Sequence, residues 1–232
     1  MKLLVKNLKV KTDNKEVLKG VNLEIKSGQV QALLGPNASG KSTLAHSILG
    51  SPRYKVICGK ILFGKYDITN FTPEKRVKLG LSLAWQNPPT IKGIKLSQLL
   101  KKISYREIEI PEGEELLERE INLGLSGGEK KISELIQILS LHPKLVIFDE
   151  IDSGLDIKKL EKVSKIIKKE LAEKGVSILL ITHLGQILNF LKPDLTNIMV
   201  DGKIVCRQKD FKKVLRTIKK YGYEKCKQRA VK

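Results

Sequence analysis

The sequence is poor in cysteine and aromatic residues, and it has no long hydrophobic run. Its three cysteines, Cys58, Cys206 and Cys226, lie far apart and form no Cys-x-x-Cys pair, so the spacing indicates neither a disulfide framework nor a zinc site. No apolar stretch is long enough for a signal-peptide core or a membrane span. We therefore expect a cytoplasmic protein with no direct membrane insertion.

Charge of one sign is abundant. Lysine and arginine together number 44 against 25 acidic residues, which gives a formal net charge of +19. Such an excess is typical of proteins that bind nucleic acid or anionic membranes. Here the lysines are spread along amphipathic segments at 158–174 and 209–220, and aromatics make up only 5% of the chain. We interpret the charge as a solvated surface, which makes nucleic acid an unlikely partner and leaves an acidic partner protein open.

Residues 35–42 read G-P-N-A-S-G-K-S, after the apolar run at 30–34 and before Thr43-Leu44-Ala45. Glycines at the first and sixth positions let a loop aim backbone N–H groups at phosphate oxygens, and the following helix N-terminus adds positive potential. In such a loop the lysine reaches the β- and γ-phosphates and the serine hydroxyl binds Mg²⁺. The sequence therefore predicts a nucleoside triphosphate site formed by Gly35, Pro36, Asn37, Ala38, Ser39, Gly40, Lys41, Ser42 and Thr43.

The rest of the pattern predicts an α/β fold. Short β-type runs at 3–10, 16–18, 21–25 and 60–63 indicate an N-terminal antiparallel sheet. Helical periodicity at 129–142, 160–175 and 211–218 alternates with continuous apolar runs at 145–148 and 176–182. Because strands and helices alternate and the apolar runs suit strands covered on both faces, we expect a mostly parallel central sheet.

Residues 86–125 lose this alternation, and they contain Pro88-Pro89 and an acidic patch at 112–120. We interpret them as part of a small, mostly helical insertion. The expected organisation is one domain over residues 1–232, with the nucleotide-binding core at 1–85 and 140–232 and an inserted helical subdomain at 86–139. We expect the tail after Tyr223 to be loose.

The strand at 145–148 ends in Asp149-Glu150, which puts two carboxylates at the carboxyl edge of the predicted sheet, where ligands bind in open α/β folds. Asp149, nearer the strand, is predicted to hold Mg²⁺ through water. Glu150 is predicted to orient or deprotonate the water that attacks the γ-phosphate.

Upstream of this strand, residues 125–129 read L-S-G-G-E and resemble the signature of ABC-type ATPases. The resemblance implies a P-loop fold that hydrolyses ATP with Mg²⁺. It identifies Gln86 as the Q-loop residue that contacts Mg²⁺, and His183 as the switch histidine that contacts the γ-phosphate. It also implies that the signature segment and the D-loop, at residues 153–156, contact the ATP held by a second copy of the chain. Two sites would then form in a transient, ATP-dependent, head-to-tail homodimer. The residues concerned are Ser126, Gly127, Gly128, Glu129 and Asp156.

Residues 149–156 read D-E-I-D-S-G-L-D, which is similar to the SufC family, the ATPases of the Suf iron–sulfur cluster assembly system. This resemblance, strongest over residues 125–222, implies a SufB/SufD-type scaffold as partner. The chain departs from the family pattern at Ile132, Leu184 and Gln186. Val10 and Lys11 stand where many ABC ATPases have an adenine-stacking aromatic residue, which predicts weak base recognition.

Two other functions are compatible with the same ATP chemistry. The chain could be the nucleotide-binding subunit of an ABC membrane transporter. It could also be a DNA-associated ABC ATPase, as the net charge of +19 suggests. That second class usually has a long coiled coil between its ATP-binding motifs, and residues 86–125 carry no such heptad pattern.

Overall fold

A six-stranded sheet forms the centre of the fold. The computed structural model describes residues 1–104, 113–183 and 185–223, so Glu112, Leu184 and the tail after Tyr223 lie outside it. The strand order is β12-β11-β3-β10-β9-β6, and every neighbouring pair is parallel except β11 with β12. The predicted mostly parallel sheet is confirmed. The strands are β3 Val30–Leu34, β6 Leu81–Ala84, β9 Leu145–Asp149, β10 Ser177–Thr182, β11 Leu195–Val200 and β12 Lys203–Gln208.

Both faces of the sheet are covered, which explains the continuous apolar runs of its central strands. Alternate residues of β9 enter different cores: Val146 and Phe148 pack on one side, Leu145 and Ile147 on the other. The first core also takes residues from α4, α5, α6 and α7, and the second encloses α1. These helices are α1 Lys41–Leu49, α4 Gly127–Ser140, α5 Ile157–Ile167, which a π-helical turn Lys168–Ala172 continues, α6 Leu188–Leu191 and α7 Phe211–Tyr221.

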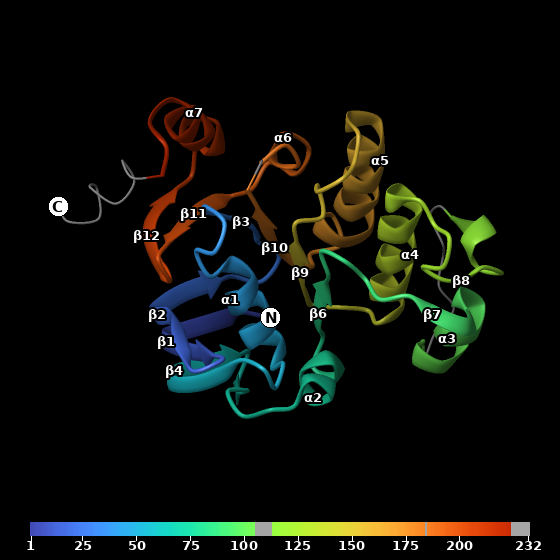
Figure 1. Cartoon of the computed structure of the whole chain (residues 1–232), viewed down its shortest axis with the longest axis horizontal. Coiled ribbons are helices and arrows are strands. Elements are labelled where there is room, and N and C mark those ends of the chain that lie inside the picture. The colour runs from blue at the N-terminus through green and yellow to red at the C-terminus, as the bar shows by residue number, and fades with distance from the viewer. Residues whose placement is uncertain (105–112, 184, 224–232) are drawn as a thin grey trace.

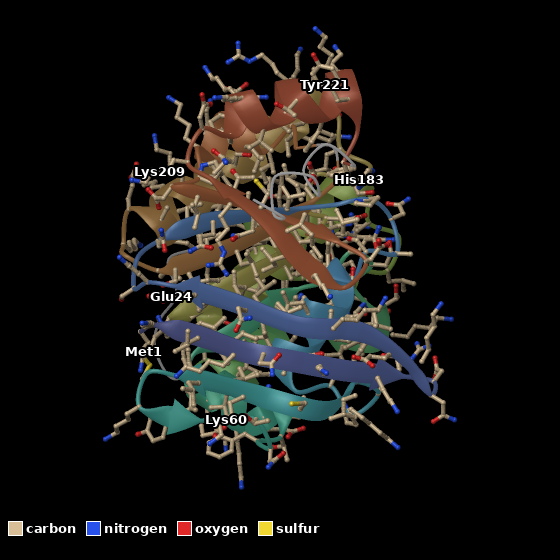
Figure 2. The ribbon with its side chains drawn as sticks, turned by 90° about the vertical axis from the view of Figure 1, so that its left-hand side faces the viewer. Met1, Glu24, Lys60, His183, Lys209 and Tyr221 are labelled. Carbon is tan, nitrogen blue, oxygen red and sulfur yellow. The ribbon has the colours of Figure 1, made fainter. Side chains whose placement is uncertain are left out.

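The second core is closed by an antiparallel sheet in the order β2-β1-β4-β5, formed by β1 Leu3–Thr12, β2 Lys15–Ile25, β4 Lys55–Phe63 and β5 Tyr66–Asp67. Figure 2 views this sheet from outside, with Glu24 and Lys60 labelled. The sequence predicted two strands at 16–18 and 21–25, whereas the structure has one strand, β2. Its register against β1 shifts at several points, and such bulges interrupt the polar–apolar alternation that defines a strand in the sequence.

The insertion lies to one side of the sheet, next to α4 (Figure 1). It contains helix α3 Leu96–Ile103, a short 3-10 turn Glu114–Leu116, and a two-stranded sheet of β7 Ile91–Lys95 and β8 Glu120–Ile121. The sequence analysis missed this sheet. All five residues of β7 are exposed, so the strand carries no alternation of apolar and polar residues.

Helix α2 Pro73–Lys78 anchors the far end of α1, the helix that follows the phosphate loop. The Arg76 side chain is buried and donates hydrogen bonds to the carbonyls of Ser47 and Ile48, in the last turn of α1, at 2.8 Å each. It also donates to the carbonyls of Phe71 and Thr69 at 2.9 and 2.8 Å. One guanidinium therefore satisfies four carbonyls and fixes α1.

Arg76→Met should lower the free energy of unfolding by about 3 kcal/mol, because it removes the side-chain donor from all four carbonyls, of which that of Ser47 keeps the Gly50 N–H at 3.2 Å. Urea denaturation followed by circular dichroism measures this loss. Arg53→Met is the matched control: Arg53 is exposed and pairs with Asp13 at 2.8 Å, and such surface pairs contribute about 0 to 1 kcal/mol. Equal midpoints for the two variants would contradict the anchoring role.

Candidate nucleotide-binding site

The loop at 35–40 curls tightly between β3 and α1, and its glycines are required by close approach. A Cβ on Gly35 would lie 2.2 Å from the Met199 carbonyl oxygen, and Gly40 has a φ of 105° with its Cβ position 2.9 Å from a Leu18 methyl group. Ala38 is left-handed, with a φ of 61°. A larger residue at position 35 would therefore clash with the Met199 main chain and change the conformation of the loop.

A turn between β11 and β12 supports this loop from outside, and the sequence analysis did not identify it. The Gly202 backbone N–H donates to the Ser39 carbonyl at 2.9 Å, and the Gly202 carbonyl accepts from Lys19 N–H at 2.9 Å. A Cβ on Gly202 would lie 2.0 Å from the Val17 carbonyl oxygen. The local signal was present, since Asp201-Gly202 between two β-type runs is typical of a tight hairpin.

Lys41 lies beneath the loop and is only 5% exposed. Its ammonium donates to the carbonyls of Gly35 and Pro36 at 2.9 and 3.0 Å. Burial lowers the pKa of Lys41, and the negative charges of Glu150 and Asp149 partly oppose that shift. Because its two hydrogen-bond partners here are neutral carbonyls, the ammonium is available to interact with an anionic oxygen above the loop.

Asp149, at the end of β9, faces the first turn of α1. Burial raises the pKa of Asp149, while a hydrogen bond from the Ser42 hydroxyl and the charges of His46 and Lys41 oppose the shift. Within the described residues its Oδ1 is buried and has no hydrogen-bond partner. The Ser42 hydroxyl and the Asp149 carboxylate, one oxygen of which is buried and unsatisfied, are hard oxygen donors, so these residues fit Mg²⁺.

Three loops at the carboxyl edge of the sheet bring Gln86, Glu150 and His183 together. Gln86 Nε2 donates to Glu150 Oε2 at 2.6 Å, and His183 Nδ1 lies 3.2 Å from Glu150 Oε1. Glu150 itself has a φ of 53°, and its N–H donates to the Ile181 carbonyl at 2.9 Å. A non-glycine residue in this left-handed backbone conformation costs about 1–3 kcal/mol, so the surrounding contacts hold the Glu150 backbone in a strained conformation.

A cavity of about 730 Å³ joins these groups. Among the predicted residues, positions 37–43, Gln86, Glu150 and His183 line it, and Gly35, Pro36 and Asp149 are not among its lining residues. Val10 is buried in the core, and β2 lines the cavity instead of the segment at 10–11. No phenylalanine, tyrosine or tryptophan lines the cavity within the described part of the chain. Lining residues that the sequence analysis did not name are Lys15, Glu16, Val17, Lys19, Ser153, Asp201 and Gly202.

The signature segment lies outside this cavity. Ser126 and Gly127 are exposed at the start of α4, where the Ser126 hydroxyl accepts from Glu129 N–H at 3.4 Å and Glu129 Oε2 accepts from Ser126 N–H at 2.7 Å. This capping box defines the helix N-terminus. Asp156 is likewise exposed and caps α5 by accepting from Lys159 N–H at 2.9 Å. The sequence-predicted site is thus divided between two surfaces of one chain.

A phosphate loop between a strand and a helix, with a buried aspartate at the end of the strand two positions away in the sheet, defines a P-loop nucleotide-binding fold. The sequence matches the family described as ABC transporter over residues 18–153. The chain belongs to this family.

Curated relatives and solved structures agree with this family assignment. The chain is 43% identical over 223 residues to the Probable ABC transporter ATP-binding protein SpyM3_0208 of Streptococcus pyogenes serotype M3, a match that covers 88% of this chain and 87% of the relative. It is 37% identical over 223 residues to Vegetative protein 296 of Bacillus subtilis, covering 88% and 85%. The ADP conformation of MJ1267, an ATP-binding cassette of an ABC transporter, superposes with a TM-score of 0.78 at 25% identity, covering 97% and 98%.

The predicted ATPase class and its ligands are therefore confirmed: the chain is an ABC-type ATPase that uses ATP and Mg²⁺. None of the helices that the structure describes is long and apolar enough to cross a bilayer.

Proposed function

We propose that this chain is a SufC-like subunit that dimerises on ATP and drives a conformational change in a SufB/SufD-type scaffold for iron–sulfur cluster assembly. The observation that carries the hydrolytic part is the contact of Glu150 with both Gln86 and His183 beside the phosphate loop. This geometry suits a carboxylate that orients and deprotonates water while two neighbours fix its direction.

The remaining residues take complementary roles. The N–H groups of residues 37–43 and the Lys41 ammonium bind the β- and γ-phosphates. Ser42, Gln86 and Asp149 hold Mg²⁺, which when bound neutralises charge on the phosphate oxygens. His183 donates a hydrogen bond to the γ-phosphate and steadies the Glu150 carboxylate.

The exposed signature segment supports the head-to-tail dimer. Ser126 and Gly127 lie outside the chain's own cavity, and the N-terminus of α4 has the positive potential that suits a phosphate. In the proposed dimer, the Ser126–Glu129 segment and Asp156 approach the ATP held by the Lys41 of the other copy. Each site then needs both chains.

The SufC-like part of the proposal is supported by the second aspartate of the D-E-I-D sequence. Asp152 is buried, and its Oδ2 accepts from the Thr182 hydroxyl at 2.7 Å. The same hydroxyl accepts from Gly185 N–H at 2.9 Å, so Asp152 joins the D-loop to the segment around His183. This aspartate is part of the resemblance to SufC, and it has a defined structural role here.

Exposed apolar side chains near the insertion support a partner surface. They follow β6, lie on β7 and follow β8, and their exposure is 44% for Trp85, 38% for Ile91, 41% for Ile94 and 40% for Leu123. Such a group marks an interaction site more often than isolated apolar residues do. A transporter's membrane subunit would use the same surface, and the names of the curated relatives favour that second candidate.

The partner's identity separates the two candidates. We would recover the tagged chain from its native cells with and without detergent and identify the co-purifying proteins by mass spectrometry. A soluble SufB/SufD-type scaffold is the expected result, and Ile94→Asp should abolish its recovery. Ile57→Asp, at a residue 46% exposed on β4, is the matched control and should not. An integral membrane subunit recovered only in detergent would contradict the scaffold proposal in favour of a transporter.

A further inference from the structure

Two buried, oppositely charged residues of α4 have no role in the site described above. Lys131 and Glu134 are 4% and 7% exposed, and their charged atoms lie 4.0 Å apart. Lys131 Nζ donates to the main-chain carbonyls of Trp85 and Gln86 at 2.8 and 2.9 Å. Glu134 Oε1 accepts from Trp85 N–H at 2.6 Å. We name Lys131 and Glu134 the α4 clamp.

The clamp forms hydrogen bonds to the main chain of residues 85–86, directly after the point where the pairing of β6 with β9 ends. Strand β6 pairs with β9 as far as Ala84, opposite Phe148. Directly after Ala84, the N–H and carbonyl of Trp85 and the carbonyl of Gln86 bond to α4 instead. The orientation of the segment at 85–86 is therefore set by the position of α4.

That segment leads directly to the catalytic carboxylate. The clamp bonds the main chain of Gln86, and the Gln86 side chain donates to Glu150 Oε2 at 2.6 Å. A continuous series of hydrogen bonds thus runs from α4, whose first residues are the signature glycines, to Glu150. A shift of α4 against the sheet would move Gln86 and change its contact with Glu150.

Stability alone is a poor explanation for this pair. A buried ion pair contributes little compared with apolar side chains of the same volume, because both charges lose their hydration. Glu134 Oε2 is buried and has no hydrogen-bond partner within the described residues, and burial raises the pKa of Glu134 to about 7. An incompletely satisfied pair whose other bonds all go to residues 85–86 suits a role in positioning those residues.

We propose that Lys131 and Glu134 are positioning residues that fix the main chain of residues 85–86 to α4, so that the position of α4 sets the contact between Gln86 and Glu150. The inference rests on the proposed roles of Gln86 and Glu150. It adds two residues to the machinery and a route by which the signature end of α4 controls hydrolysis.

The variant that tests it is Lys131→Met combined with Glu134→Gln. It removes both buried charges together, so neither is left unpaired, and the glutamine oxygen still accepts from Trp85 N–H. We expect a lower unfolding temperature, because the carbonyls of Trp85 and Gln86 lose the Lys131 donor, but a chain that still folds. ATP affinity should stay within about twofold, and kcat should fall roughly ten- to a hundredfold, because small misplacements of catalytic groups have effects of this size. Lys130→Met removes the same charge one position earlier on α4 and should leave kcat unchanged.

A double-mutant cycle shows whether the clamp acts through Gln86. If it does, adding the clamp substitutions to Gln86→Ala should cause little further loss of kcat. A normal kcat in the clamp variant, or losses that multiply in the Gln86→Ala background, would overturn the inference. A different result would show that the proposed function itself is wrong: Glu150→Gln would then retain ATP turnover. If Glu150→Gln is inactive while the clamp variant is fully active, only the role of the clamp is refuted.

Discussion

Glu150→Gln should lower ATP turnover by at least about a hundredfold, the scale expected when a general base is removed, while ATP still binds. Glutamine has the same shape and can still accept from Gln86 Nε2, so the contact at 2.6 Å can persist. It lacks the negative charge that polarises water. With hydrolysis blocked, the ATP-bound dimer should accumulate.

Phosphate release in single-turnover conditions, ATP binding by fluorescence, and molar mass by light scattering measure the three parts of this result. Glu161→Gln is the matched control, since Glu161 is on the surface of α5 and pairs with Lys165 at 2.9 Å. That variant should turn over normally. Turnover above half the wild-type rate in Glu150→Gln would remove Glu150 from the proposed role.

Lys41→Ala should weaken ATP binding itself. The Lys41 ammonium is buried beneath the loop and, within the described part of the chain, donates only to carbonyls, at 2.9 and 3.0 Å. A charged hydrogen bond contributes about 1.5–3 kcal/mol, so losing the contacts to two phosphates should raise the Kd roughly a hundredfold or more. Hydrolysis then fails because substrate is not held.

Isothermal titration with ATP and Mg²⁺ measures the Kd, and thermal unfolding shows whether the variant is folded. Lys60→Ala removes an equal charge from β4, where Lys60 is exposed and 3.6 Å from Asp67, and should bind ATP like the wild type. An unchanged Kd in folded Lys41→Ala would contradict the role of this loop in binding phosphate.

Much of the fold could be predicted because its signals are local. The apolar runs at 30–34 and 145–148 became β3 and β9, both fully buried. The helical periodicity after Glu129 and Phe211 became α4 and α7. Strand β7 had no such signal because all its residues are exposed, and β2 was divided in the prediction because its alternation is interrupted by bulges.

In the site, too, the features with a local sequence signal could be predicted and the others could not. Its motifs are short and contiguous, and their order along the chain indicated the phosphate loop, the two carboxylates and the glutamine and histidine near them. Gly202 is joined to Ser39, 163 positions away, by a main-chain hydrogen bond. The α4 clamp is joined to residues 45–49 positions away by hydrogen bonds from its side chains to the main chain. Such contacts leave no pattern in the sequence, so they could be found only in the folded chain.

The central claim is that each ATP lies between the Lys41 of one chain and the Ser126 of another. Lys41→Ala and Ser126→Arg chains should each be inactive, but mixing them should restore turnover. Random pairing makes half the dimers mixed, each with one intact site of two, so recovery should reach roughly a quarter of the wild-type rate. If the mixture stays as inactive as its components while Ser126→Arg still binds ATP, the shared site is contradicted.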